Sequence, residues 1–309
     1  MPSNRTHESS GQRKSQQPDM QQTTAVHLEE SKAATQDINE EDLAAAHTFV
    51  EVNTTLASQI IRKTDMHLLP LCVVINIFNF IDRSNIGNAR LLGMQHDLQL
   101  SGNKYNIAVM CIFISGSAVE IPANIICKKI GTKVWLPMIV FTFGLITTLM
   151  SLTHTAEGLY IARFFLGIPE GGVSPAIIWL LSQFYRRAEM GLRTSIYISA
   201  AASSGAFGGL LAIGLSKIPR WGLIHTWRNI YFFEGLVSIA IGIIAFRVIP
   251  NGPDDARFLS QEERQTALNR LQVDAAGTNE GGKTKWKHIK QALTSPHVLG
   301  SGLGLLLGK

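Results

Sequence analysis

Six long apolar stretches occupy the middle of the chain, and each of them contains few charged residues. A helix rises about 1.5 Å per residue, so about 20 residues are needed to cross a hydrocarbon core of about 30 Å. These stretches have about that length and are too long for the core helices of an ordinary soluble domain. The pattern therefore predicts an all-α integral membrane protein with six spans, at residues 68–92, 105–126, 135–152, 159–181, 195–215 and 230–249.

The polar segment before these spans, residues 1–66, is rich in Gln, Ser, Thr and Glu and has few aromatic residues. Such a composition buries too little apolar surface to offset the entropy of ordering, which predicts a mostly disordered tail with transient helix over residues 43–61. Residues 67–249 then form one six-helix unit.

A polar segment, residues 250–297, follows the sixth span. Ser260 and Glu263 have the spacing of a helix capping box, which predicts a short amphipathic surface helix. Its last part is basic and contains Trp286, as expected of a segment at the inner membrane face. Hydrophobicity resumes over residues 298–309, where we expect the truncated start of a seventh helix.

The charge distribution predicts the orientation. The net charge of +5 could suggest nucleic acid as a partner, but many basic residues lie in short loops between spans, so nucleic-acid binding is not expected. Lys and Arg are more frequent on the N-terminal side, which predicts a cytoplasmic N-terminus. On that side lie Arg62, Lys63, Lys128, Lys129, Lys133, Arg186, Arg187, Arg193, Arg247, Arg257 and Arg264, against Arg90, Lys104, Lys217, Arg220 and Arg228 on the other.

Catalytic and metal chemistry find no support in the residue pattern. The three cysteines, Cys72, Cys111 and Cys127, have neither metal-ligand nor redox spacing, and no catalytic triad or phosphate-binding loop stands out. We therefore expect no enzyme activity, no metal site and no cofactor.

Charged side chains inside two spans are the strongest functional signal. Asp82 and Arg83 lie in the first span, and Arg163 and Glu170 lie seven residues apart in the fourth, on nearly one helix face and about 10 Å apart along its axis. A charge at the bilayer midplane costs about 2.5–3.5 kcal/mol, so these groups should face an interior pathway or one another. The alternative is that they are structural ion pairs that brace neighbouring helices.

Particular chemistry follows from these residue types. The planar guanidinium of Arg83 can hold a carboxylate through two parallel hydrogen bonds, and Asn85 continues the same polar stripe and offers donors to a ligand. Glu170 follows Pro169 in a helix segment loosened by proline and glycine, which makes its buried carboxyl a candidate proton carrier. For Arg163, bracing or snorkelling near the outer end is an equally open alternative.

A second polar series, Glu120, Asn124 and Lys128, recurs at four-residue intervals near the inner end of the second span. We interpret it as an inner gate, with anchoring of the helix end as the alternative. Small residues four apart, such as Gly167 with Gly171, indicate close helix packing rather than chemistry.

Five motifs then resemble, in chain order, the N-terminal half of a major facilitator transporter of the anion:cation symporter group, and within it the fungal allantoate, nicotinate and pantothenate permease branch. They are FNFIDRSNIGNAR, EIPANIICKKIG, RFFLGIPEGGVSPAIIWLLSQFYRRAEMGLR, SGAFGGLLA and WRNIYFFEGLVSIAIG. The resemblance implies a fold of two six-helix halves rocking about a central site. It further implies proton-coupled symport of a small organic anion across the plasma membrane.

The resemblance also implies roles for individual residues. Asp82 and Glu170 resemble the protonatable acids of the family, Arg83 its substrate-facing arginine, and Arg163 the arginine that interacts with the acids during coupling. Asn85 belongs to the same first-helix motif. The chain departs from the general pattern at Asn124, where a glycine is usual, and at Lys128, where an acid is usual.

The implied partners are a small organic anion, protons and the lipid bilayer, with a second transporter half or a homodimer needed to complete the cavity. Two other functions remain open. One is a non-transporting half-transporter or sensor that pairs with another membrane protein, and the other is a drug:proton antiporter.

Overall fold

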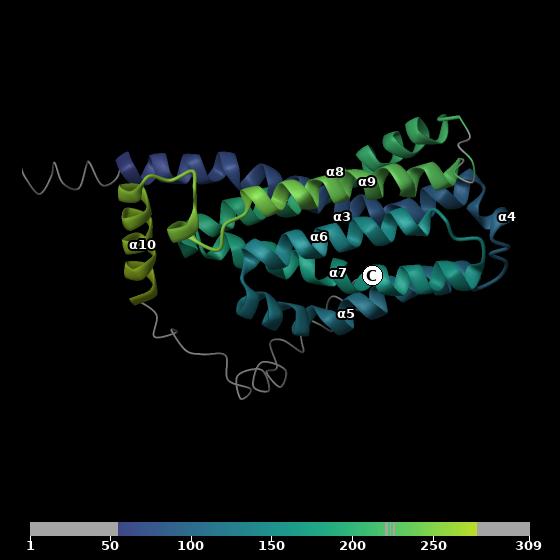
Figure 1. The fold of residues 1–309 in the computed structure, drawn as a ribbon, viewed down its shortest axis with the longest axis horizontal. Helices are drawn as coiled ribbons and strands as arrows, with labels where there is room; N and C mark the ends of the chain where they lie inside the picture. Colours follow the sequence, from purple (N-terminus) through teal and green to yellow (C-terminus); the bar gives the residue numbers. More distant parts are fainter. Residues whose placement is uncertain (1–54, 220–221, 223, 225, 277–309) are drawn as a thin grey trace, which may run out of the picture. The chain divides into compact units, whose positions relative to one another are not determined.

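The computed structural model describes residues 55–219, 222, 224 and 226–276. Within this part, six helices are long and apolar enough to cross a membrane. They lie side by side in Figure 1 and confirm the six predicted spans. Their bounds are α3 Leu69–Ala89, α5 Lys104–Ile130, α6 Thr132–Met150, α7 Ala156–Ser182, α8 Arg187–Ser216 and α9 Trp227–Val248.

Short elements complete the described chain. A π-helical turn, Arg90–Met94, and the short helix α4, Gln95–Asp97, extend α3. A 3₁₀ turn, Pro253–Asp255, precedes α10, Gln261–Ala276. The predicted seventh helix and the basic segment around Trp286 lie outside the described residues, as does the predicted transient helix as far as residue 54.

Local chemistry explains several helix ends. Gly131 separates α5 from α6 with φ at 91°, a backbone conformation that favours glycine because it has no Cβ. Thr155 caps α7, because its hydroxyl accepts a hydrogen bond from the Gly158 amide at 3.1 Å. These breaks allow each helix to reverse direction within a few residues.

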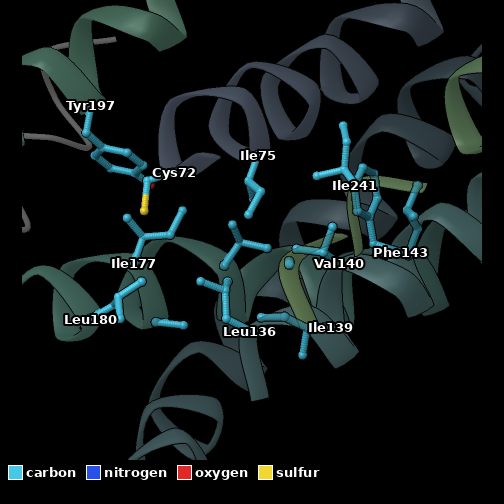
Figure 2. Packing of buried hydrophobic residues seen from close by; sticks show 14 of the residues in the cluster. Cys72, Ile75, Leu136, Ile139, Val140, Phe143, Ile177, Leu180, Tyr197 and Ile241 are labelled. Atoms are coloured by element: carbon cyan, nitrogen blue, oxygen red, sulfur yellow. The ribbon is translucent and has the colours of Figure 1, made fainter. Parts of the chain in front are cut away.

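Helix pairing determines which faces meet. The largest contacts join α6 to α9, α5 to α7, and α3 to α8. Figure 2 shows apolar packing among α3, α6, α7 and α9, with Ile75 of α3, Val140 and Phe143 of α6, Ile177 of α7 and Ile241 of α9. The core therefore joins helices from across the described chain, and this packing holds the polar side chains of the same helices in place.

Glycine permits the closest approach between helices. A Cβ added to Gly171 of α7 would lie 2.9 Å from the Cα of Gly116 in α5, a distance that real side chains do not tolerate. A Cβ on Gly144 of α6 would lie 2.7 Å from the backbone nitrogen of Ile239 in α9. Both sites have the small-residue packing that membrane helices use in place of a hydrophobic driving force.

Residues 55–67 are helical, whereas we expected a disordered tail as far as residue 66. The reason is tertiary contact, because Ile60 and Thr64 are buried at 3% and 2% exposure. Asp65 also forms an ion pair with Arg193 at 2.8 Å and accepts a hydrogen bond from the Tyr185 hydroxyl at 2.6 Å. The polar composition of residues 55–67 gave no indication of these contacts with distant residues.

The same end of the bundle carries α10, labelled in Figure 1, and we call it the α10 end. The predicted capping box is present: the Glu263 amide donates to the Ser260 hydroxyl at 3.3 Å, and the Ser260 amide donates to the Glu263 carboxylate at 2.8 Å. Lys63 pairs with Glu263 at 2.5 Å, and Arg270 pairs with Glu189 of α8. These pairs attach α10 to the helical segment 55–67 and to α8.

Candidate functional site

Four ionisable side chains are almost completely buried between α3, α7 and α9. Asp82, Arg163, Glu170 and Glu234 have exposures of 0%, 1%, 2% and 1%. Three of them were singled out from the sequence, and the structure places them within electrostatic reach of one another. Because isolated charges are costly at this depth, their gathering into one cluster offsets part of that cost.

Arg83 forms the most accessible contact of this cluster. Its Nε donates to Oε2 of Glu170 at 3.0 Å, and its side chain is 31% exposed while that of Glu170 is 1% exposed. The guanidinium also lies over the Phe80 ring, 5.4 Å from the ring centroid. Arg83 therefore joins a buried acid to a more open space.

That space is a pocket of about 160 Å³ between α3, α5 and α7. Arg83 and Glu170 line it together with Glu120, Ser117 and Ser174. The pocket thus has one cation, two carboxylates and two hydroxyl groups in its wall. It is small for a ligand site, in keeping with a wall formed by a single bundle.

Asp82, the neighbour of Arg83 in α3, is not among the residues that line this pocket. The Thr147 hydroxyl of α6 donates to Oδ1 of Asp82 at 3.5 Å, and both residues have no measurable exposure. Among the described residues, no arginine or lysine forms a direct ion pair with Asp82, although Arg163 lies within electrostatic reach of it. Although Asp82 and Arg83 are neighbours in the sequence, the guanidinium of Arg83 binds Glu170 instead.

Arg163 is held by an aromatic residue that the sequence analysis did not identify. Its Nη2 donates to the Tyr231 hydroxyl of α9 at 2.9 Å, and the guanidinium lies 5.6 Å from the Tyr231 ring centroid. A side chain with 1% exposure cannot snorkel, so this alternative for Arg163 is wrong. The bracing alternative is compatible with the Tyr231 contact.

Glu234 is the second residue whose part in the cluster was missed. It accepts a hydrogen bond from Nδ2 of Asn85, and Asn88 donates to Oδ1 of Asn85 at 3.3 Å. The same reasoning that selected Glu170, a lone acid within an apolar run, would have selected Glu234. Asn85, predicted to face a ligand, is fully buried and bound to this acid.

The charges of the cluster do not balance if every group is ionised, since three carboxylates face two guanidinium groups. One oxygen of each acid, Oδ2 of Asp82, Oε1 of Glu170 and Oε1 of Glu234, has no hydrogen-bond donor among the described residues. The carboxyl groups can exchange protons, whereas the guanidinium groups remain charged. The cluster can therefore change its net charge by taking up or releasing protons.

The predicted gate residues do not form one network in the described part of the chain, where no hydrogen bond joins Glu120, Asn124 and Lys128. Glu120 lines the pocket beside Arg83 and Glu170. Lys128 lies instead over the Trp179 ring, 4.9 Å from its centroid. A gate function for these residues stays a prediction, with Glu120 closer to the charged cluster than expected.

Over residues 55–219 and 226–276, no group of three or more His, Cys, Asp or Glu side chains is placed to hold a metal ion. The carboxyl and guanidinium groups of the site can exchange protons and bind a charged or polar molecule.

Comparison with known proteins relates this architecture to a family. The family model of the Major Facilitator Superfamily matches residues 72–308. The MFS-type transporter efuF of Hormonema carpetanum is 34% identical over 215 residues, which cover 70% of this chain and 43% of that protein. The MFS-type transporter cnsO of Penicillium expansum is 32% identical over 240 residues, 76% of this chain and 46% of that protein.

Solved structures share the fold at lower identity. An inward-facing, occupied bacterial homologue of the human lysosomal transporter Spinster superposes with a TM-score of 0.52 and 20% identity, over 60% of this chain and 45% of that one. The inward open xylose transporter XylE from E. coli gives a TM-score of 0.50 and 14% identity, over 69% of this chain and 57% of that one.

The chain spans less than half the length of the two curated relatives described above. Its match to the family model begins at residue 72, inside α3, and extends through the other five membrane-length helices to residue 308. The chain is a multi-pass membrane protein and belongs to the Major Facilitator Superfamily.

Proposed function

We propose that the chain forms the N-terminal half of a transporter that couples the movement of a small organic anion to protons. The proposed direction is symport across the plasma membrane, with the N-terminus in the cytoplasm. The five motifs that resemble the anion:cation symporter group support this choice of substrate class. Two relatives that bear transporter names, efuF and cnsO, support transport as the activity.

The observation that carries the proposal is the ion pair between Arg83 and Glu170 at the wall of the pocket. The pair is built from one group that can bind a carboxylate and one group that can bind a proton. In major facilitator transporters the substrate site lies between two six-helix halves, so a pocket on one half supplies one wall of it. A second half, or a second copy of the chain, would supply the other wall.

Coupling follows from competition for Arg83. While Glu170 is ionised it occupies the guanidinium at 3.0 Å, and a carboxylate substrate must displace it. When Glu170 takes up a proton, it loses the charge that holds Arg83. The guanidinium then becomes free to bind the substrate through two parallel hydrogen bonds. Proton uptake and anion binding thus favour one another.

Asp82, Arg163 and Tyr231 have a supporting role in this proposal. Asp82 can accept a proton beside Arg163, and the Tyr231 hydroxyl holds Arg163 at 2.9 Å on the side of α9. A change in the charge of Asp82 or Glu170 alters the electrostatic balance around Arg163. We propose that this change shifts α7 relative to α9 during transport.

The test is uptake of labelled nicotinate, pantothenate, allantoate and ureidosuccinate by cells that express the protein, in acidic and in neutral medium. We expect uptake of at least one carboxylate, faster in acid, and loss of that uptake in Arg83→Gln at unchanged surface expression. Arg83→Lys should retain only a minor part of it, because lysine cannot form the bidentate contact.

Arg90→Gln is the matched control, because it removes an exposed arginine from the π-helical turn that extends α3. This variant should transport like the unaltered chain. Uptake that survives Arg83→Gln, or that falls equally in both variants, would remove the substrate role of Arg83. Export of hydrophobic cations that is unchanged in Arg83→Gln would favour a drug:proton antiporter instead.

A further inference from the structure

A second pocket, distinct from the charged cluster, opens at the α10 end of the bundle. It has a volume of about 420 Å³, within the range of small-molecule sites. Its wall combines the last turn of α9, the first turn of α6 and the segment around the 3₁₀ turn. The lining side chains with charge or aromatic character are His67, Lys133, Phe246, Arg247, Asp255, Arg257 and Phe258.

Positive charge predominates in this pocket, with three permanent cations facing one carboxylate. Lys133 is already engaged, because its ammonium binds both oxygens of Asp255 at 2.8 and 3.1 Å. Arg257 lies close enough to influence Asp255 electrostatically without a direct ion pair. Across the described residues, neither Arg247 nor Arg257 forms a hydrogen bond or ion pair with another side chain. Two guanidinium groups are thus available to an anion.

His67 completes the wall of the pocket in a fixed orientation. Its ring stacks on Phe258 with centroids 4.7 Å apart and planes inclined by 11°. Its Nδ1 lies 2.8 Å from the Lys63 carbonyl oxygen, which accepts hydrogen bonds only, so Nδ1 carries a proton. The stacking therefore gives the pocket one ordered aromatic wall beside the two arginines.

An apolar surface leads directly to these charges. Leu236, Ile243 and Arg247 follow one another at helical spacing on α9, and all three are exposed. Phe246, beside Arg247, is 44% exposed and lines the pocket itself. In a membrane-spanning helix, an exposed apolar stripe of this kind faces hydrocarbon, and Arg247 in the last turn marks its polar boundary.

We infer that this pocket binds the phosphate group of an anionic membrane lipid, with an acyl chain along the exposed stripe of α9. Arginine suits phosphate because its planar guanidinium presents parallel donors to two phosphate oxygens. Basic pockets between membrane helices on the cytoplasmic side are recurrent sites for anionic headgroups. The bound lipid would join α6, α9 and the segment before α10, independently of substrate transport.

The test uses the full chain purified in a mild detergent, with lipid adducts counted by native mass spectrometry. The probes are dioctanoyl phosphatidic acid, zwitterionic dioctanoyl phosphatidylcholine, and inorganic phosphate. We expect one saturable phosphatidic acid site, bound about tenfold more tightly than phosphatidylcholine, which corresponds to about 1.4 kcal/mol. Inorganic phosphate should compete only weakly, because it lacks the acyl chains.

The double variant Arg247→Gln/Arg257→Gln should weaken phosphatidic acid binding about tenfold and leave phosphatidylcholine binding unchanged. The matched control is Arg62→Gln/Lys129→Gln, which removes two exposed cations from the same end of the bundle. Circular dichroism checks that both variants are folded.

Three outcomes would overturn the inference. Equal loss of binding in both double variants would indicate general charge attraction. Equal affinity for phosphatidic acid and phosphatidylcholine would exclude selection of an anionic headgroup. Inorganic phosphate bound as tightly as the lipid would assign the pocket to a soluble phosphate compound.

Discussion

Replacement of Glu170 by Gln isolates the proposed competition for Arg83. The amide has nearly the shape of the acid but carries no charge, so it corresponds to a permanently protonated Glu170. The Arg83–Glu170 ion pair at 3.0 Å then disappears, and the guanidinium is free at every pH. We therefore expect anion binding to become tighter in neutral medium and independent of pH.

The size of the effect follows from the geometry of the pair. Breaking a fully buried ion pair costs about 3–5 kcal/mol, and exposed pairs contribute about 1 kcal/mol or less. Since Arg83 is 31% exposed and Glu170 only 1% exposed, an intermediate value of about 2 kcal/mol is appropriate. A substrate that no longer has to displace Glu170 should then bind about 30-fold more tightly in neutral medium.

The assay is equilibrium binding of the best labelled carboxylate to purified protein, in acidic and in neutral buffer. Glu120→Gln is the control, because it removes another carboxylate from the wall of the same pocket without removing the acid that binds Arg83. The unaltered chain and this control should bind more tightly in acid, whereas Glu170→Gln should show equal affinity in both buffers. Weaker neutral-pH binding in Glu170→Gln, or a pH dependence that persists, would refute the competition.

Three further predictions concern stability. Gly171→Ala should lower the stability of the bundle by about 1–3 kcal/mol, because its new Cβ meets the backbone of α5. Thermal unfolding in detergent should show no such loss for Gly205→Ala, where the new Cβ would have no neighbouring atom from another helix within 4 Å. Tyr231→Phe should destabilise by about 1–3 kcal/mol, because buried Arg163 loses an acceptor, and an unchanged melting temperature would contradict this. A hydrogen bond from the Lys63 ammonium holds the pKa of Glu263 below its ordinary value. The Lys63–Glu263 pair therefore stabilises α10 at pH values above the ordinary pKa of Glu263, and this contribution is lost as the pH falls through the lowered pKa. The loss should be about 0.5–1 kcal/mol, because the Lys63 side chain is 46% exposed and solvent weakens the pair. Hydrogen exchange of α10, corrected for its intrinsic rate, should show this loss in the unaltered chain and none in Glu263→Gln.

The number and position of the spans could be predicted because they depend on local composition. A run of apolar residues long enough to cross the bilayer is helical wherever its neighbours lie, since every backbone group must be satisfied within the helix. The predicted spans and the observed helices differ only at their ends, as with α8, which begins at Arg187 rather than at residue 195. There a capping arrangement at Arg186 and Glu189, not hydrophobicity, determines the start.

The partners within the cluster could not be predicted, because they depend on which helices lie side by side. Asn85 and Glu234 are 149 positions apart, and Arg163 and Tyr231 are 68 apart. The sequence indicates that each buried charge needs a partner, but the choice among several candidates requires the packing of α3 and α7 against α9. The ordered helix over residues 55–67 was missed for the same reason, because its stability comes from contacts with distant residues.

In the proposed transporter, a substrate anion reaches Arg83 from water through the pocket between α3, α5 and α7. Single cysteines placed at Ser117 and Ser174, both in the pocket wall, probe this route in a chain whose native cysteines are replaced. Their reaction with a membrane-impermeant thiosulfonate reagent is then measured with and without the transported carboxylate. If the anion takes this route, both cysteines should react, the carboxylate should slow their reaction, and Arg83→Gln should abolish this protection. Cysteines that never react, or that react equally fast with saturating carboxylate present, would contradict it.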